Sequence, residues 1–454
     1  MRKVLLISYY FPPLGGSPAQ RILKFTKYLP EFGWEPIVLT VRRPVGEIRD
    51  ESLMAQIPPE LKVYRAPCWG TTQALFERRE PHSALQRARD WILRLYGYLL
   101  VPDPMVGWVI PAIRESKRIF QIHPDIEVIL TSSPPPSVNL IGRMLRQYSS
   151  RPWVADFRDA WMSIPDRDQR RLKIRMRDTF EIWLEHLCAR HFDYLISVNQ
   201  PIVDDWIARY PCLCERTSVI TNGFDPDDFE DVKDIQNTKF TMVYTGTFLS
   251  GRDPMPFLQA LHSLLDDWPS LRQQIQVLFV GDDSARARID VITQLNLGNT
   301  VRVLPYLPRR EALAYQKGAD VLLLFGTLPT GDPQRDRQNL TGKIFEYMAS
   351  GRPILAMAPD SVATDLVREL QLGMTVPSTD VPKIRQALEL LLKQAQEGRL
   401  GVKLEPARLS SFYREELTRQ LAHILDVVSA RKSSARIHPD CLRTSIWSRG
   451  EEGS

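Results

Sequence analysis

A lysine and a glutamate share one short predicted helix in residues 339–357, NLTGKIFEYMASGRPILAM. Lys343 and Glu346 are three residues apart, so they lie on the same helix face. Backbone N–H groups and the dipole at a helix start can bind a diphosphate, and Lys343 would add a positive charge there. Glu346, one turn further, could accept two hydrogen bonds from a ribose diol. The predicted phosphate- and ribose-binding segment comprises Asn339, Leu340, Thr341, Gly342, Lys343 and Glu346. The alternative is a surface ion pair between Lys343 and Glu346, which would contribute little to stability.

A second candidate anion site follows the first predicted strand, residues 3–10, where the chain reads FPPLGGSPAQR. Gly15 and Gly16 permit close approach of a ligand to the backbone, and the helix that starts at Ser17 offers N–H groups. The spacing is neither that of a P-loop nor G-x-G-x-x-G, so neither an NTPase nor a dinucleotide site is indicated. A plain glycine turn explains this stretch equally well.

A third cluster lies in DFRDAW, at the end of another predicted strand. Asp156 or Asp159 could orient or deprotonate an acceptor hydroxyl, and Arg158 could bind a phosphate. Ser132 and Ser133 end a neighbouring predicted strand. The alternative is a buried Asp–Arg pair that fixes the loop.

Short apolar strands alternate with helical segments along the whole chain, which predicts an α/β fold with parallel sheets covered by helices. Two Rossmann-like domains that face each other across a cleft follow from this pattern, because ligands bind beyond the carboxyl ends of such strands. The expected divisions are a first domain at 1–222 with a helical insertion at about 70–121, a second domain at 223–409, a returning helix at 410–430 and a mobile tail at 431–454.

The composition is that of an ordinary globular protein, with 43% apolar and 25% charged residues among 454. A net charge of +5 fits an anionic ligand or an anionic membrane surface and gives little support for nucleic-acid binding. The N-terminus lacks a signal-peptide cleavage pattern, and charges and prolines interrupt the most apolar stretch, residues 91–113. We therefore expect a cytoplasmic protein. Basic and aromatic residues of the insertion could contact anionic lipid, although packed helices with snorkelling basic side chains explain them as well.

Four separated segments resemble family 4 glycosyltransferases, which are retaining enzymes of the GT-B fold. They are VADFRDAW, VITNGFD, VYTGTFLSGRDPMPFLQAL and TGKIFEYMASGRPILA, in the order expected for that family. The resemblance implies that the second domain binds a nucleotide-sugar donor and the first a carbohydrate or lipid-linked acceptor. It implies no metal and no further cofactor.

The resemblance also implies roles for single residues. Glu346 matches the ribose-binding second glutamate of an E-x7-E motif, whereas Gln338 stands where the first glutamate is expected, so Asn339 or Asp336 could substitute for it. Arg252 resembles the residue that clamps the donor phosphates, and Gly16 the glycine that lies against the diphosphate. Tyr306 and Leu307 resemble the loop that holds the base. Together with the reasoning from the residues above, this predicts Arg252, Lys343 and Asp159 as the catalytic residues.

Two other functions fit the same residues. A sugar-nucleotide epimerase of the same fold would consume the donor without an acceptor. A non-catalytic nucleotide-sugar-binding protein is suggested by Gln338.

Overall fold

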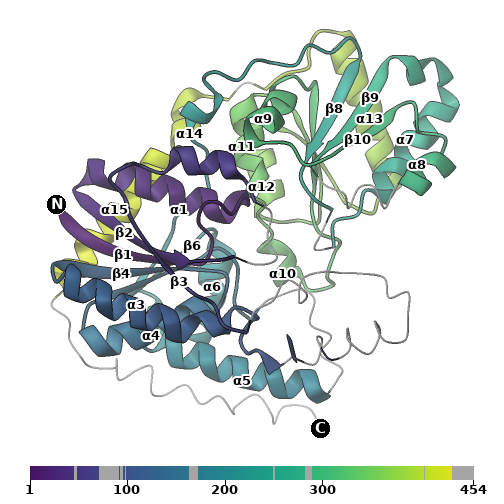
Figure 1. The fold of residues 1–454 in the computed structure, drawn as a ribbon. Coiled ribbons are helices and arrows are strands. Elements are labelled where there is room, and N and C mark those ends of the chain that lie inside the picture. Colours follow the sequence, from purple (N-terminus) through teal and green to yellow (C-terminus); the bar gives the residue numbers. More distant parts are fainter. Residues whose placement is uncertain are drawn as a thin grey trace. The chain divides into compact units, whose positions relative to one another are not determined.

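The computed structural model describes residues 1–44, 49–70, 92, 96–97, 99–162, 172–248, 251–281, 289–402 and 404–431. The expected tail after residue 431 and residues 71–91 of the expected insertion lie outside this part of the chain. The chain forms two compact units, Met1–Thr221 together with the chain from Leu417 onward, and Asn222–Glu416. Each unit contains one parallel sheet with helices, which confirms the expected α/β fold class (Figure 1).

The first unit is built on a seven-stranded parallel sheet in the order β3-β2-β1-β4-β5-β6-β7. The central strand β1 pairs with β2 and β4, so that Leu5 faces Ile37 on one side and Ile129 on the other. The strands are β1 (Arg2–Ser8), β2 (Trp34–Val41), β3 (Lys62–Ala66), β4 (Ile126–Ser133), β5 (Trp153–Phe157), β6 (Tyr194–Ser197) and β7 (Thr217–Val219).

Helices cover both faces of this sheet, which explains why its strands are apolar at consecutive positions rather than at alternate ones. Leu5 and Ile7 belong to a core shared with α3, α4, α5 and α6, whereas Val4 and Leu6 belong to a core shared with α1 and α15. The helices are α1 (Gly16–Tyr28), α3 (Val109–Ile122), α4 (Ser137–Ser149), α5 (Leu172–Ala189), α6 (Gln200–Arg209) and α15 (Arg414–Ala430).

Helix α15 supplies part of the first unit's core. Leu417, Leu421 and Leu425 are buried against the face of the sheet that carries Val4 and Leu6. Its polar side also contacts the sheet, because the Trp34 indole donates to Asp426 over 2.9 Å. The first unit therefore consists of two separate stretches of chain.

The second unit is built on a six-stranded parallel sheet in the order β10-β9-β8-β11-β12-β13. The strands are β8 (Phe240–Thr245), β9 (Ile275–Val280), β10 (Val301–Leu304), β11 (Val321–Phe325), β12 (Ile354–Met357) and β13 (Gly373–Val376). The order steps outward in both directions from β8 and β11, so the carboxyl ends of these two strands mark a topological switch point, where open α/β sheets bind ligands.

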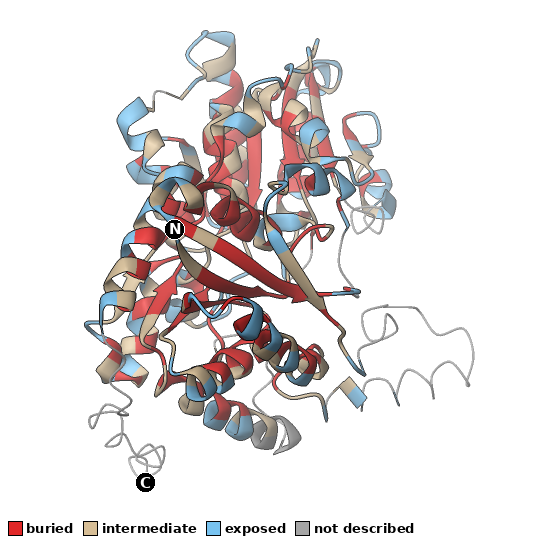
Figure 2. Cartoon of the chain, turned by 60° about the vertical axis from the view of Figure 1, so that its left-hand side comes forward, coloured by how far each residue is buried: buried red, intermediate tan, exposed pale blue. Residues whose placement is uncertain are grey.

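Helices also cover both faces of the second sheet, and its four inner strands are mostly buried (Figure 2). One face packs against α7 and α13, and the other against α11 and α12. The helices are α7 (Met255–Asp267), α8 (Ile289–Gln294), α9 (Arg309–Lys317), α10 (Pro333–Arg337), α11 (Lys343–Ser350), α12 (Val362–Glu369), α13 (Val381–Gln396) and α14 (Pro406–Ser410).

Short 3-10 helices connect these elements: η1 (Leu29–Phe32), η2 (Glu51–Gln56), η4 (Val106–Trp108), η5 (Pro211–Leu213), η6 (Pro226–Phe229) and η7 (Pro269–Gln273).

Within the described part of the chain, no helix has both the length and the apolar character needed to cross a bilayer. The same residues contain no group of three or more His, Cys, Asp or Glu side chains arranged to hold a metal ion.

Candidate functional site

Lys343 begins α11, and its side chain lies directly against the backbone where β8 ends. A Cβ built on Gly246 would stand 2.2 Å from Lys343 Cε, and Gly246 has a φ of +123°. Only glycine fits this position, because other residues would clash and would be strained. Lys343 Nζ lies 5.4 Å from the centroid of the Tyr244 ring, within cation–π distance. No side chain caps the first turn of α11, and Lys343 is its first residue.

The charge of Lys343 is coupled to those of Arg252 and Glu346. Burial and then the positive charge of Arg252 lower the pKa of Lys343 to about 7, although the carboxylate of Glu346 acts in the opposite direction. The structure therefore brings together the two cations and the glutamate that the sequence singled out. An anion bound here would interact most strongly with the protonated lysine, because opposite charges favour the charged form of a group.

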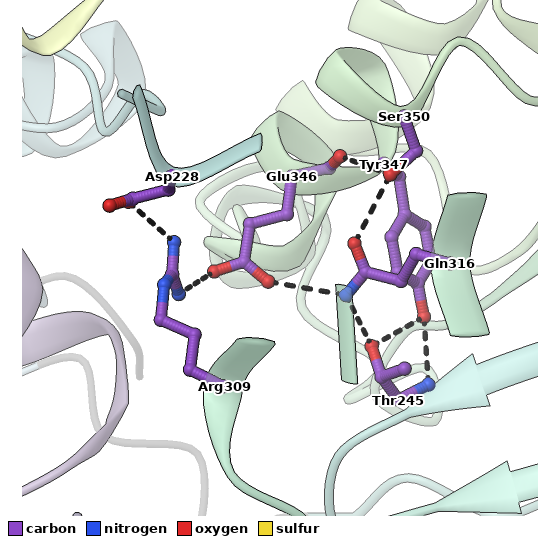
Figure 3. Close-up of polar contacts among 7 residues, drawn as sticks. All are labelled: Asp228, Thr245, Arg309, Gln316, Glu346, Tyr347 and Ser350. Atoms are coloured by element: carbon purple, nitrogen blue, oxygen red, sulfur yellow. Dashed lines mark hydrogen bonds and ion pairs between the residues drawn. The ribbon is translucent and has the colours of Figure 1, made fainter. Parts of the chain in front are cut away.

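Glu346 is held by two side chains that both come from α9 (Figure 3). Arg309 Nη1 donates to Glu346 Oε1, and Gln316 Nε2 lies 3.4 Å from Oε2. Arg309 also donates to Asp228 Oδ2 over 3.2 Å, which links α9 to η6. Neither Arg309 nor Gln316 was singled out from the sequence.

The same network continues from α9 and α11 to the end of β8. Gln316 Nε2 donates to Thr245 Oγ1 over 2.9 Å, and the Thr245 N–H donates to the Tyr347 hydroxyl over 3.0 Å. Ser350 Oγ donates to the Glu346 carbonyl over 2.9 Å and lies 3.3 Å from Gln316 Oε1. Because the side chains of two helices and one strand are tied together (Figure 3), the position of Glu346 is fixed relative to the strand end.

The loops around α11 are also joined to each other. The Leu328 N–H donates to the Gly251 carbonyl over 2.9 Å, and this contact connects the loop after β11 with the loop that carries Arg252. Asn339 Nδ2 donates to Thr327 Oγ1 over 2.7 Å. Both loops therefore approach the segment before α11, as a site at the carboxyl edge of the sheet requires.

The two residues considered as substitutes for a glutamate at Gln338 have structural contacts. Asp336 is buried, and its Oδ1 accepts the Thr330 hydroxyl over 2.9 Å and the Thr330 N–H over 3.1 Å. Asn339 uses its amide on Thr327. Gln338 itself is half-buried at the end of α10.

The other residues of this unit that were predicted to bind the sugar donor follow β10 or precede α11. Tyr306, after β10, is 42% exposed and could stack on a flat ring, whereas Leu307 and Leu340 pack on one apolar core. Thr341 accepts the Ile344 N–H over 3.3 Å at the start of α11, and Gly342 is the N-cap.

In the first unit, Asp156 forms a buried ion pair with a partner that the sequence did not indicate. Arg21 Nη2 donates to Asp156 Oδ1 over 2.8 Å and Arg21 Nε to Oδ2 over 3.1 Å, with both side chains at most 1% exposed. Ser132 Oγ also donates to Oδ2, over 2.8 Å. Arg21 donates further to the Ile220 and Thr221 carbonyls. These contacts leave Asp156 buried in a structural pair, whereas Asp159, three residues later, is exposed.

Arg158 is buried at the end of β5, beside the loop that follows β4. Its Nη2 donates to the Pro134 carbonyl over 2.7 Å and its Nε to the Ser133 carbonyl over 3.2 Å. Its Nη1 has no hydrogen-bond partner among the described residues. Burial lowers the pKa of Arg158, and the charges of Asp156 and Asp159 act in the opposite direction.

Gly15 and Gly16 begin α1 in the first unit. Gly15 is the N-cap, Gly16 has a φ of +84° and is exposed, and no side chain caps this helix. Gly16 and Ser17 thus offer backbone N–H groups to a ligand, whereas Pro18 in the same turn has none. Gly15, Gly16, Ser133, Asp156, Arg158 and Asp159 belong to the first unit, and the other predicted site residues to the second.

Three residues of the site have only weak signals in the sequence. Arg309 and Gln316 are seven residues apart, which places them on one helix face, and Arg309 directly follows Pro308. Asp228 lies in an acidic segment, DPDD, that resembles a linker. No local pattern indicates that Arg309 reaches Glu346, which is 37 residues away.

Part of the chain matches a known protein family, and the whole chain is similar to several solved structures. Residues 243–394 match the family model described as "Glycosyl transferases group 1". No curated protein matches the sequence. Over 95% of this chain and 100% of the other, the structure is similar to sucrose-phosphate synthase from Thermosynechococcus elongatus, with a TM-score of 0.64 and 17% identity.

Two further solved structures show the same likeness. WaaG, a glycosyltransferase involved in lipopolysaccharide biosynthesis, has a TM-score of 0.54 and 14% identity over 96% of this chain and 100% of the other. An E. coli trehalose-6-phosphate protein bound with UDP-2-fluoro glucose has a TM-score of 0.57 and 11% identity over 95% and 99%. The chain therefore has the GT-B fold, and the segment that holds Arg252, Lys343 and Glu346 matches the group 1 glycosyl transferase family.

Proposed function

We propose that this protein is a retaining glycosyltransferase that moves a sugar from a nucleotide-diphosphate sugar to a carbohydrate or lipid-linked acceptor in cell-surface polysaccharide biosynthesis. One observation carries the proposal: Arg252, Lys343 and Glu346 interact electrostatically at the uncapped start of α11, inside the segment that matches the transferase family. Two cations and a helix start suit a diphosphate, and a glutamate one turn away suits a ribose.

The chemistry that follows is loss of the diphosphate from the anomeric carbon. Negative charge grows on the leaving diphosphate, and Arg252, Lys343 and the N–H groups of α11 would stabilise that charge in fixed positions. Attack by the acceptor on the face that the diphosphate leaves would retain the anomeric configuration. No step in this scheme requires a metal ion.

The acceptor would bind to the first unit. Asp159 is exposed beside the buried guanidinium of Arg158, so it could accept the proton of an acceptor hydroxyl. Asp156 would act indirectly, since Arg21 occupies both of its oxygens.

A lipid-linked acceptor would require the protein to contact a membrane surface. Helix α5 carries exposed aromatic side chains that could make this contact. Phe180 and Trp183 are 47% and 46% exposed and stack with ring centroids 5.3 Å apart. The sequence before them, RRLKIRMR at 170–177, contains five basic residues, of which Arg177 is paired with the buried Glu181 and is followed by Asp178. Aromatic and basic side chains together suit the headgroup region of an anionic bilayer.

The donor assignment is tested by binding. A panel of nucleotide sugars would be screened by thermal shift, since a ligand that binds only the folded protein raises its melting temperature. Glu346→Ala should then weaken binding of the selected nucleotide roughly ten- to a hundredfold, because a charged hydrogen bond to the ribose is lost. Glu311→Ala, which removes an exposed glutamate from α9, is the matched control and should bind as the wild type does. Unchanged affinity in Glu346→Ala would remove this residue from the site.

A second candidate function rests on Gln338, which departs from the family's glutamate. A protein that binds nucleotide sugars without transferring them would bind the donor with full dependence on Glu346, yet give no product across a broad acceptor panel. An epimerase would convert the donor in the absence of any acceptor. Incubation with the donor alone therefore distinguishes an epimerase from a transferase and from a non-catalytic binding protein.

A further inference from the structure

Arg309 connects the joining segment that follows the first unit, at η6, to the glutamate at the donor site. Its guanidinium lies between two carboxylates from different elements, Asp228 in η6 and Glu346 in α11. Its side chain is 17% exposed, and those of Asp228 and Glu346 are 8% and 24% exposed. These ion pairs are therefore partly shielded from water, unlike ordinary surface pairs.

The two carboxylates stabilise the charge of the partly buried arginine. Burial alone would lower the pKa of Arg309, but the charges and hydrogen bonds of Glu346 and Asp228 outweigh that effect and raise it. A partly buried cation held by two carboxylates is difficult to displace, because moving it would break both ion pairs and leave both carboxylates without their partner. Arg309 is thus a fixed reference point for the flexible side chain of Glu346.

Glu346 is held in a way that leaves it able to bind a ligand. An ionised carboxylate has about four acceptor positions, and a ribose diol needs two of them. Arg309 takes a position on Oε1 and Gln316 lies on the Oε2 side (Figure 3). Both oxygens therefore keep capacity for a hydroxyl, while the plane of the carboxylate is set by contacts from α9.

We propose that Arg309 is a positioning residue that orients Glu346 for a ribose diol, and that Asp228 supports it from the joining segment. The proposal rests on the function proposed above. It predicts that the preference for ribonucleotides over 2′-deoxyribonucleotides depends on Arg309, although Arg309 itself does not touch the nucleotide. Orientation of a group in advance lowers the entropy lost on binding, so losing it weakens only the contact that was oriented.

The test compares affinities for UDP and GDP with those for their 2′-deoxy forms, measured by calorimetry on the full chain. Wild type should prefer the better ribonucleotide about tenfold or more. Arg309→Gln should reduce that preference to about threefold or less while binding the deoxy form as the wild type does. Arg310→Gln is the matched control, because Arg310 is the next residue, its side chain is 70% exposed, and its side-chain contacts are to Asp231.

Further variants keep the test decisive if Arg309→Gln does not fold. Arg309→Lys should recover part of the preference, and Asp228→Asn should lose part of it. Equal weakening of both nucleotide forms, or a full preference in the Arg309 and Asp228 variants, would overturn the proposal. If wild type binds no nucleoside diphosphate at all, the proposed function itself fails, and this outcome is distinct from binding without a role for Arg309.

Discussion

At the scale of single residues, Lys343 combines a half-buried position with a proposed task that requires charge. Its pKa is lowered to about 7, chiefly by burial and then by Arg252. Near neutral pH it is therefore partly neutral in the ligand-free protein. A diphosphate would favour the protonated form, so binding above this pKa would take up a proton.

Nucleotide affinity should accordingly fall as pH rises from about 7 to about 9, by up to roughly tenfold per pH unit for one linked proton. The sign follows because the form that binds best is the one lost as pH rises. Lys343→Arg keeps its charge over this range and should show a nearly flat profile. Calorimetry across this pH range measures the effect, and Lys317→Arg, on α9, should keep the wild-type slope. A flat wild-type profile would contradict the assignment of Lys343 to the phosphates.

At the scale of elements, the ion pair of Arg21 and Asp156 connects α1 to β5. Arg21 also connects α1 to the residues after β7, where the first stretch of the first unit ends. The pair is buried, and Arg21 also donates to the carbonyls of residues 220 and 221. Such a pair is better evidence for a fixed arrangement than for high stability, because both charges were removed from water. Asp156 is therefore a buried structural residue and is not exposed to an acceptor.

Asp156→Ala should lower the free energy of unfolding of the first unit by about 3–5 kcal/mol, because Arg21 would stay buried without its partner. Chemical denaturation followed by tryptophan fluorescence would measure this loss. Arg118→Ala removes an exposed cation whose partner is Glu115, and should change stability by about 0.5 kcal/mol or less. An Asp156→Ala protein that is as stable as wild type but lacks transferase activity would restore Asp156 to the acceptor site.

The sequence predicts the helices and strands well, but it does not predict the side-chain contacts between them. Runs such as IEVILTSS predict β4 at residues 126–133, and β4 occupies the same residues, because a buried parallel strand has a strong local pattern. Lys343 and Glu346 are also visible in sequence, since a three-residue spacing on a helix sets their mutual position. The partners Arg309 and Arg21 are not visible, because their contacts join residues 37 and 135 positions apart. Such contacts depend on how helices are placed on the sheet, which no local pattern encodes.

At the scale of the whole molecule, the fold is shared with proteins that are only 11–17% identical. A shared fold does not by itself determine what a protein binds, so the acceptor and location must be tested on surfaces of this chain. The exposed aromatic pair on α5, Phe180 and Trp183, is one such surface.

Replacing both Phe180 and Trp183 by serine should reduce binding to vesicles that contain phosphatidylglycerol by about tenfold or more, because two apolar side chains no longer enter the headgroup region. Co-sedimentation measures the bound fraction. Trp268→Ser is the control, since Trp268 is 48% exposed but lies in the second unit. Equal binding by the double variant and wild type, or no dependence on anionic lipid, would contradict a membrane role for α5.

The return of α15 to the first sheet has a consequence for how the protein is made. The second unit occupies an uninterrupted stretch, whereas the first needs both the opening residues and those after Leu417. During translation the later unit can close its core while the earlier one still lacks α15, which together with α1 covers the sheet face that carries Val4 and Leu6. Part of that apolar face is therefore uncovered, and prone to aggregation, until α15 has left the ribosome.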